Sequence, residues 1–167
     1  MQRIDCPKIE LMLAIDIPGF KKVGAAHLVL DYNGTLAIDG KLIEGVLPLL
    51  KVLCNHLTIH ILTADTFGTS KVEVSETNCI LKVIEPKVQD IQKEMYVINL
   101  GIDNVIAVGN GMNDALMLKS AALGIAVIQN EGASVNTLIN ADIVCNSIVN
   151  ALELLTNPLR IVATLRK

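Results

Sequence analysis

Short apolar runs alternate with longer segments of helical periodicity along most of the chain. Seven apolar runs are short enough to be buried strands: 9–17, 27–31, 58–63, 79–84, 105–110, 124–128 and 141–145. The segments between them predict helices at 45–56, at 66–77 with a weak pattern, within 87–100, and at 113–122, 133–140 and 147–156. Strands that are apolar on both sides and alternate with helices indicate a parallel sheet covered on both faces.

The pattern therefore predicts an α/β fold with a doubly wound, Rossmann-like parallel sheet. The chain has 167 residues, which fits a single domain 1–167, with residues 1–20 forming an N-terminal strand or hairpin extension. This length is sufficient to bury most of the apolar surface without disulfides or metals.

Composition excludes several classes of partner. Hydrophobic residues make up 51% of the chain, the net charge is −3, and only two Tyr and two Phe are present. With no basic run and few rings for base stacking, we expect neither nucleic acid nor an acidic membrane as partner. No stretch approaches the ~20 apolar residues that span a bilayer. The cysteines form no CxxC pair, so we expect free thiols and a cytoplasmic location.

Polar clusters follow three of the predicted strands. These are "DYNGT" from Asp31, "TADT" from Thr63 and "GNGMND" from Gly109. Each alone is compatible with an ordinary turn or helix cap. Because ligands bind at the carboxyl ends of the strands in such sheets, we expect the three clusters to meet in one pocket.

The side chains of this pocket indicate phosphoryl transfer. Asp31 is a carboxylate nucleophile or metal ligand, and backbone N–H groups near Gly34 suit an anion. Oxygen ligands without clustered Cys or His favour Mg²⁺ over zinc. The candidate oxygen donors after the later strands are Thr63, Asn110, Asn113 and Asp114. A nucleophilic carboxylate, an anion site and Mg²⁺ together predict an aspartyl-phosphate intermediate.

Over residues 27–150 the order of these motifs resembles the haloacid dehalogenase superfamily of phosphohydrolases. "DYNGTL", "LTAD" and "GNGMNDALML" are similar to the DKTGTL, TGD and GDGxND stretches of the phosphorylation domain of P-type ATPases. The chain looks closest to small soluble P-type-ATPase-like phosphatases. The resemblance implies a haloacid-dehalogenase-like core and a Mg²⁺-dependent phosphatase.

The resemblance also implies roles for the first two motifs. Asp31 would be the nucleophile and a metal ligand, and Asn33 would give Mg²⁺ its backbone carbonyl. Gly34 would contact the substrate. Thr63 and the adjoining Ala64 would bind the phosphoryl group.

For the later motifs the resemblance implies a lysine and a metal site. Lys93 would clamp the phosphate, since Val97 and Leu100 reproduce the family's spacing after the lysine, and Lys87 is the alternative. Asn110 would occupy the position of a metal-binding Asp. Asn113 and Asp114 would support the metal. In the second motif, Asp65 matches the acid of TGD.

Two amides depart from the family's pattern. Asn33 stands where typical phosphatases carry an Asp that acts as general acid and base, and an amide cannot shuttle a proton. Asn110 removes a negative charge from the metal site. We therefore expect slow hydrolysis and weak binding of Mg²⁺.

Three readings of function follow. The first is the slow phosphatase, and the second is a non-catalytic phosphatase-like protein with a binding or regulatory role. The third is an unrelated nucleotide-binding domain, but "DYNGTLAIDG" lacks GxGxxG spacing.

The spacing between the first two motifs also bears on the substrate. Only about thirty residues separate Asp31 from Thr63, and a turn and a helix account for them, so no large cap domain fits. An open pocket would accept a phosphorylated small molecule or protein, or would use a second subunit as a lid. A homo-oligomer is possible.

Overall fold

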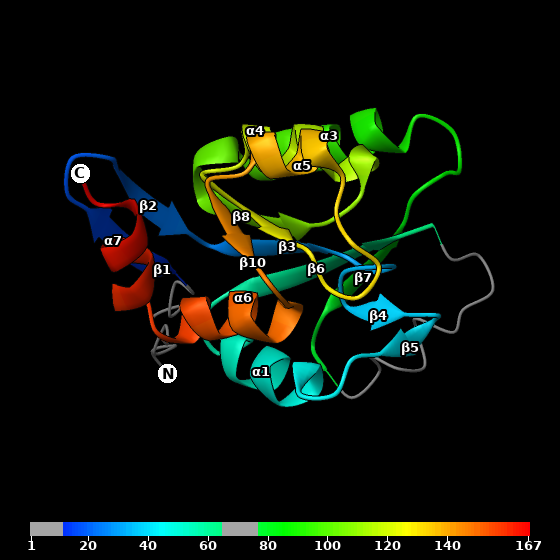
Figure 1. Cartoon of the computed structure of the whole chain (residues 1–167), viewed down its shortest axis with the longest axis horizontal. Helices are drawn as coiled ribbons and strands as arrows, with labels where there is room; N and C mark the ends of the chain where they lie inside the picture. Colours follow the sequence, from blue (N-terminus) through cyan, green and yellow to red (C-terminus); the bar gives the residue numbers. More distant parts are fainter. Residues whose placement is uncertain (1–11, 65–76) are drawn as a thin grey trace, which may run out of the picture.

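A six-stranded parallel sheet forms the centre of the protein (Figure 1). The computed structural model describes residues 12–64 and 77–167. The strands lie in the order β10–β9–β8–β3–β6–β7. Their bounds are β3 His27–Asp31, β6 Thr58–Thr63, β7 Ile80–Val83, β8 Val105–Gly109, β9 Leu123–Val127 and β10 Ile143–Cys145. β3, the first strand of this sheet along the chain, lies in its middle. The next two strands, β6 and β7, are added on one side, and the last three are added on the other, which confirms the predicted doubly wound fold.

Helices cover both faces of this sheet (Figure 1). On one face lie α3 (Gln89–Leu100), α4 (Ala115–Ser120) and α5 (Val135–Asn140). On the other lie α1 (Val46–Leu53) and α6 (Ile148–Thr156), and α7 (Leu159–Leu165) packs against the N-terminal hairpin. Two short 3₁₀ turns, η1 (Ile102–Asn104) and η2 (Met112–Asp114), precede β8 and α4.

Alternation along the strands divides the core into two layers. Leu28 and Leu30 of β3 belong to the cluster under α1 and α6, whereas Val29 packs with Val97 of α3 and Met117 of α4. All five side chains are fully buried, and the burial of each contributes roughly 1.5–3 kcal/mol to the free energy of unfolding. Since side chains two apart along a strand share a face, the strand places Asp31 on the same side as Val29, towards α3.

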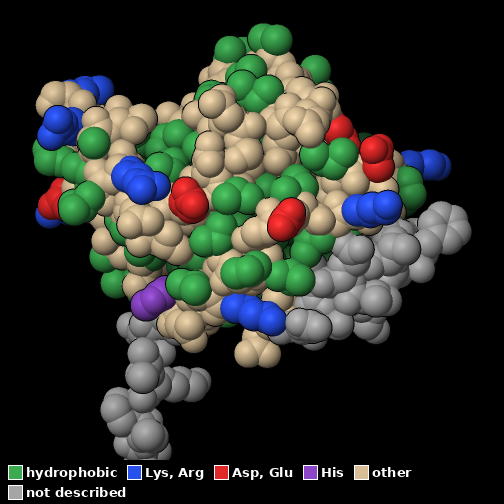
Figure 2. All heavy atoms as spheres, turned by 60° about the horizontal axis from the view of Figure 1, so that its bottom comes forward, with side chains coloured by type: hydrophobic (Ala, Val, Ile, Leu, Met, Phe, Trp, Pro, Cys, Tyr) green, Lys and Arg blue, Asp and Glu red, His purple; other side chains and the backbone are tan. Residues whose placement is uncertain are grey.

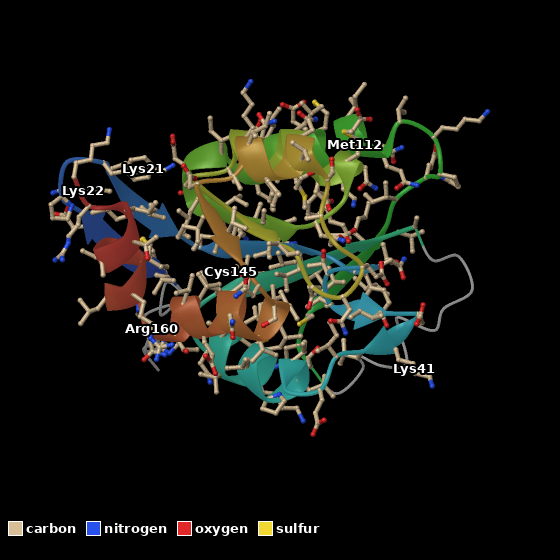
Figure 3. The ribbon with its side chains drawn as sticks, viewed as in Figure 1. Lys21, Lys22, Lys41, Met112, Cys145 and Arg160 are labelled. Carbon is tan, nitrogen blue, oxygen red and sulfur yellow. The ribbon has the colours of Figure 1, made fainter. Side chains whose placement is uncertain are left out.

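The N-terminal hairpin joins β1 (Leu13–Ile17) to β2 (Lys21–Ala25). β1 falls within the predicted strand 9–17, while residues 1–11 lie outside the described part of the chain. The strand or hairpin extension was predicted within residues 1–20, and β2 lies just beyond these bounds. Lys21, labelled in Figure 3, donates to the Asp142 carboxylate at 3.2 Å. One oxygen of Asp142 also accepts the Gly124 N–H at 2.9 Å, so this ion pair ties the hairpin to β9.

A second hairpin, which was not predicted, follows β3. β4 (Ala37–Ile38) and β5 (Lys41–Leu42) pair in an antiparallel manner between Asp31 and α1. Asp39 and Gly40 both have positive φ, as the two central residues of a type I′ hairpin turn require. Asp-Gly is a sequence signal for this turn. The expectation of only a turn and a helix in this interval is therefore wrong.

The remaining elements lie close to their predicted positions. α1 ends at Leu53 rather than at residue 56, and a 3₁₀ turn replaces the start of the predicted helix 113–122. The predicted helix 66–77 lies almost entirely outside the described residues, and α7 was not predicted. In the described part of the chain no single helix is long and apolar enough to cross a membrane, although α6 and α7 together, bent by 107°, reach that length and composition. On the face in Figure 2, acidic and basic side chains are scattered among hydrophobic ones.

Candidate active site

The three polar loops meet at the carboxyl edge of the sheet. Asp31 ends β3, Thr63 ends β6, and Asn110 directly follows β8. β3 pairs with β6 on one side and with β8 on the other, which brings the three strand ends side by side. Asp31, Thr63 and Asn110 are all buried. The structure thus brings together the clusters whose convergence the sequence predicts.

Lys93 lies at the centre of this group. Its Nζ donates to Asp31 Oδ1 at 2.6 Å and to Asp114 Oδ1 at 2.7 Å, and its side chain is only 3% exposed. α3 positions it, since Lys93 and Val97 are four residues apart and face the sheet together. Lys87, the alternative lysine, is exposed before α3. The lysine beside the candidate nucleophile is therefore Lys93.

Asp114 organises the loop that follows β8. Its Oδ2 accepts the N–H groups of Asn110 and Gly111, both at 2.9 Å, while its Oδ1 accepts from Lys93. A Cβ on Gly109 would lie 2.5 Å from Asp114 Cγ, so glycine is required there for the carboxylate to fit. Because these contacts use both oxygens, they favour a supporting role for Asp114, and direct metal ligation stays a prediction.

Burial dominates the electrostatics of this group. Burial and the nearby Asp114 raise the pKa of Asp31 to about 7, although Lys93 acts in the opposite direction. Burial alone would lower the pKa of Lys93, but Asp31 and Asp114 outweigh it, and the pKa of Lys93 is raised. Lys93 is thus held as a cation between two carboxylates.

The turn after Asp31 packs against the Asn110 loop. Gly34 has a φ of +77°, and a Cβ there would lie 2.7 Å from Asn110 Nδ2. Thr35 Oγ1 donates to Asn110 Oδ1 at 3.2 Å. The Gly34 N–H, which was expected to face an anion, donates to the Ala37 carbonyl at 2.7 Å instead. Gly34 therefore acts by allowing close approach, and its N–H is not available to a ligand in this conformation.

The other predicted residues lie around this centre. Asn33 is exposed at the rim, where its backbone bridges to Ala37. Thr63 is buried, and Ala64 is half-buried. Asp65 lies outside the described residues.

Asn113 contacts the start of α3. Its Nδ2 donates to Gln89 Oε1 at 2.7 Å, at the start of α3. It therefore joins the Asn110 loop to the helix that carries Lys93.

A fourth loop at this edge carries polar residues that were assigned no functional role from the sequence. Gln129 Nε2 donates to the carbonyls of Gly34, at 3.1 Å, and Thr35, while its Oε1 accepts the Ile148 N–H. The loop after residue 128 was recognised as a strand end. Its "QNEG" residues nevertheless read as an ordinary polar turn, and only their position after β9 indicates a functional role.

The donor set at this edge fits Mg²⁺. The Asp31 carboxylate, the Asn33 backbone carbonyl and the Asn110 amide oxygen are hard oxygen donors, and the absence of a Cβ on Gly34 lets the Asn110 amide pack closely against the Asp31 turn. Among the described residues, no three His, Cys, Asp or Glu side chains cluster as a metal site. A cation here would therefore depend on carbonyl and amide oxygens as well as on carboxylates.

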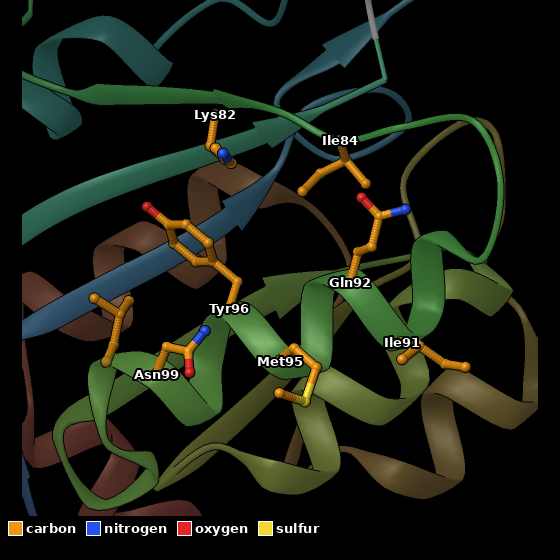
Figure 4. Close-up of a pocket in the computed structure, with 8 residues that line it drawn as sticks. Lys82, Ile84, Ile91, Gln92, Met95, Tyr96 and Asn99 are labelled. Atoms are coloured by element: carbon orange, nitrogen blue, oxygen red, sulfur yellow. The ribbon is translucent and has the colours of Figure 1, made fainter.

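A hollow of about 450 Å³ lies elsewhere, between β7 and the outer side of α3 (Figure 4). Its lining residues are Lys82, Ile84, Ile91, Gln92, Met95, Tyr96, Asn99 and Leu100. No residue of the Asp31 or Asn110 loops lines it, so this hollow is separate from the site at the strand ends.

The sequence matches a family model over residues 53–150, described as haloacid dehalogenase-like hydrolase. This range includes Thr63, Lys93, Asn110 and Asp114, while the Asp31 loop precedes it. The chain is also 53% identical over 62 residues to the uncharacterized protein MJ0073 of Methanocaldococcus jannaschii. That match covers 37% of this chain and 67% of that protein.

Solved structures share the fold. A 3-deoxy-D-manno-octulosonate 8-phosphate phosphatase from Moraxella catarrhalis, in complex with a magnesium ion, a phosphate ion and a KDO molecule, has 16% identity and a TM-score of 0.61. The match covers 84% of this chain and 92% of that one. A zinc-transporting PIB-type ATPase in the E2.Pi state has 22% identity and a TM-score of 0.59, over 74% of this chain and 20% of that one. The family match covers more than half of the chain. The protein therefore belongs to the haloacid dehalogenase-like hydrolase family, as its motifs predict.

Proposed function

We propose that the protein is a Mg²⁺-dependent phosphohydrolase that acts through an aspartyl-phosphate on Asp31. The observation that carries this proposal is the contact between Lys93 and Asp31, 2.6 Å long and buried at the carboxyl edge of the sheet. An ammonium group in this position holds the carboxylate in place and would attract a phosphoryl group. Membership of the hydrolase family supports the same chemistry.

The reaction would take place in two displacements. A carboxylate oxygen of Asp31 attacks phosphorus, the bond from phosphorus to the leaving oxygen breaks, and the leaving group takes a proton. Water then attacks the aspartyl-phosphate, which releases inorganic phosphate and restores the carboxylate. Lys93 stabilises the ionised Asp31 that the first step needs. Mg²⁺ held by Asp31, the Asn33 carbonyl and Asn110 would supply positive charge to the phosphoryl oxygens.

Asn33 makes this enzyme slow in our proposal. The amide sits at the exposed rim next to the nucleophile but has no titratable group. General acid–base catalysis contributes roughly 10²–10⁴-fold, and Asn33 cannot provide it. We therefore expect the aspartyl-phosphate to accumulate.

A non-catalytic binding or regulatory protein is the second candidate. The two amides Asn33 and Asn110 support it, since they remove an acid–base group and a metal-binding charge from the family's pattern. The same buried Lys93 and Asp31 would then recognise a phosphorylated partner without turning it over.

Incubation with acetyl phosphate or p-nitrophenyl phosphate and Mg²⁺ separates these candidates. Phosphate release and the acid-stable, hydroxylamine-sensitive protein phosphate are both measured, in the wild type and in Asp31→Asn. Asp31→Asn should abolish both, because an amide is a far weaker nucleophile. Asp103→Asn, an exposed residue in η1, is the matched control.

Turnover near the wild-type rate in a folded Asp31→Asn protein would contradict the covalent mechanism. A wild type that neither turns over nor becomes labelled would favour the binding protein. A phosphorylated small molecule or protein as substrate, a cytoplasmic location, a homo-oligomer and the likeness to P-type ATPases stay predictions from the sequence.

A further inference from the structure

The loop after β9 is fastened to both parts of the site. Gln129 holds the carbonyls of Gly34 and Thr35, and Asn110 Nδ2 donates to the Gly132 carbonyl at 3.1 Å. Positive φ angles at Gln129 (+55°) and Gly132 (+80°) turn the loop back over the sheet edge. Residues 130 and 131 are therefore held between the Asp31 turn and the Asn110 loop.

Glu131 directs its carboxylate into this junction. From the position that a Cβ on Gly34 would take, Glu131 Oε2 lies 2.9 Å away, and Asn110 Nδ2 and Oδ1 lie 2.7 and 2.9 Å away. The Glu131 carboxylate thus lies close to the Asn110 amide group, beside Gly34, the residue that follows Asn33. Among the described residues, no hydrogen bond or ion pair of the Glu131 side chain explains its position, and the residue is exposed.

The net charge of the site indicates what the Glu131 carboxylate could contribute. Asp31 and Asp114 carry two negative charges when ionised, Lys93 carries one positive charge, and Asn110 is neutral, so the net charge is −1. Glu131 brings the net charge to −2, which balances a divalent cation.

We infer that Glu131 belongs to the divalent-cation site and supplies the anionic oxygen that Asn110 lacks. It binds the cation directly or through a bridging water. The inference rests on the proposed function for the presence of Mg²⁺, but it assigns a residue outside the three motifs that indicate phosphoryl transfer.

A binding measurement tests this without turnover. The metal-free full-length protein is titrated with Mn²⁺, free Mn²⁺ is followed by electron paramagnetic resonance, and Mg²⁺ is then added as a competitor. Loss of a group that supports a metal typically lowers affinity about 10–100-fold, and we expect this for Glu131→Gln. Glu153→Gln is the matched control, because Glu153 lies on α6 and pairs with Arg160 at 3.7 Å.

A charge exchange makes the test specific. Asn110→Asp alone should tighten Mg²⁺ binding, because it adds a charge next to Glu131. The double variant Asn110→Asp with Glu131→Gln has the wild-type net charge and should return the affinity close to the wild-type value. Circular dichroism checks that each variant is folded.

The outcomes separate this inference from the proposed function. Equal cation affinity in wild type and Glu131→Gln, or an equal loss in Glu131→Gln and Glu153→Gln, overturns the inference and leaves the phosphatase proposal to its own test. Weaker binding in Glu131→Gln alone, in a protein without turnover, upholds the inference while the phosphatase proposal fails. A wild type that binds neither cation overturns both.

Discussion

Two polar networks, one buried and one partly buried, are built from the same strand and the same helix, β3 and α3. In one, Asp31 at the end of β3 binds Lys93 of α3 at 2.6 Å. In the other, His27 at the start of β3 contacts His60 of β6 at 3.0 Å, and His60 contacts the Tyr96 hydroxyl of α3 at 2.9 Å. The first network is charged, and the second consists of groups that can all be neutral.

The periodicity of strands and helices explains why β3 and α3 each contribute a residue to both networks. His27 and Asp31 are four residues apart on a strand and share a face, and Lys93 and Tyr96 are three apart on a helix. In the histidine network each of the two contacts can pair one donor with one acceptor while all three groups are neutral, which is typical of a structural network. In the Asp31 network a negative charge is left over at an open edge. This imbalance distinguishes a place for a ligand from a part of the core.

Burial favours the neutral form of the titrating side chain in each network. Burial, then the neighbouring His27, lowers the pKa of His60 to about 4. Burial also raises the pKa of Asp31 to about 7. Because one group is a base and the other an acid, their effects on stability have opposite dependence on pH.

The largest effect is expected from Lys93→Met, which removes the only ammonium that contacts Asp31 among the described residues. Two buried carboxylates then face each other without a cation, and breaking a buried ion pair costs about 3–5 kcal/mol. The free energy of unfolding, measured with urea at pH 8 in EDTA, should fall by this amount. Phosphorylation of Asp31 should be lost.

Lys87→Met is the matched control for this change, because Lys87 is exposed and its side chain is equally long. It should alter neither stability nor phosphorylation. If the two variants behave alike, Lys93 is not the clamping lysine, and the comparison of the two networks fails.

The second-largest effect is expected in the pH dependence of stability, to which the two networks contribute with opposite sign. The folded protein holds a proton on Asp31 between pH 3.8 and about 7, where the unfolded chain does not, so this group makes stability fall as pH rises. The unfolded chain holds a proton on His60 between about pH 4 and 6.5, so this group makes stability rise with pH. Each contribution is on the order of a few kcal/mol over its range.

Single variants should reveal the two opposing slopes. Asp31→Asn should leave a free energy of unfolding that rises from pH 4 to 6.5. His60→Gln, which keeps a polar side chain but does not titrate, should leave one that falls from pH 4 to 7. Urea unfolding in EDTA at several pH values measures both. Parallel curves for the two variants would mean that these groups do not control the pH dependence.

Tyr96→Phe should have a smaller effect, confined to the neutral network. It removes the hydroxyl that pairs with His60 and leaves one ring nitrogen of a buried histidine without its partner. Such a loss costs about 1–3 kcal/mol. Phosphate release should stay unchanged, because Tyr96 lies beside the hollow in Figure 4 and not at the Asp31 edge. A change in turnover without a loss of stability would show that the two networks are coupled.

Most of the fold and the centre of the site were predictable from local patterns. Buried parallel strands have a recognisable apolar pattern, and their carboxyl ends necessarily share an edge, which brings Asp31, Thr63 and Asn110 together. The choice of Lys93 over Lys87 rested on the spacing to Val97 and Leu100, and α3 does bury Lys93 and Val97 together.

Features that depend on distant partners were not predictable. β2 contains Lys21 and Lys22, and Lys21 is partly buried by its ion pair with Asp142, 121 residues away. α3 exposes large apolar side chains on its outer face, so its sequence pattern does not reveal which side is buried. Glu131 reads as an ordinary loop acid until the fold places it beside Gly34.

The smallest effect concerns the rim of the charged network, where Asn33 is exposed beside the nucleophile. Asn33→Asp keeps the backbone carbonyl and adds a titratable group of the same length. We expect a gain of about tenfold in phosphate release, below the 10²–10⁴-fold of an evolved acid–base group, because the surrounding residues are suited to an amide. The gain should be larger for alkyl phosphates than for p-nitrophenyl phosphate, whose leaving group needs little protonation. Less aspartyl-phosphate should be trapped at steady state, whereas Asn150→Asp, exposed on α6, should change neither quantity. An unchanged rate and an unchanged amount of intermediate in a folded Asn33→Asp protein would mean that this side chain does not face the reacting phosphate, and the binding protein would then be the better reading of the site.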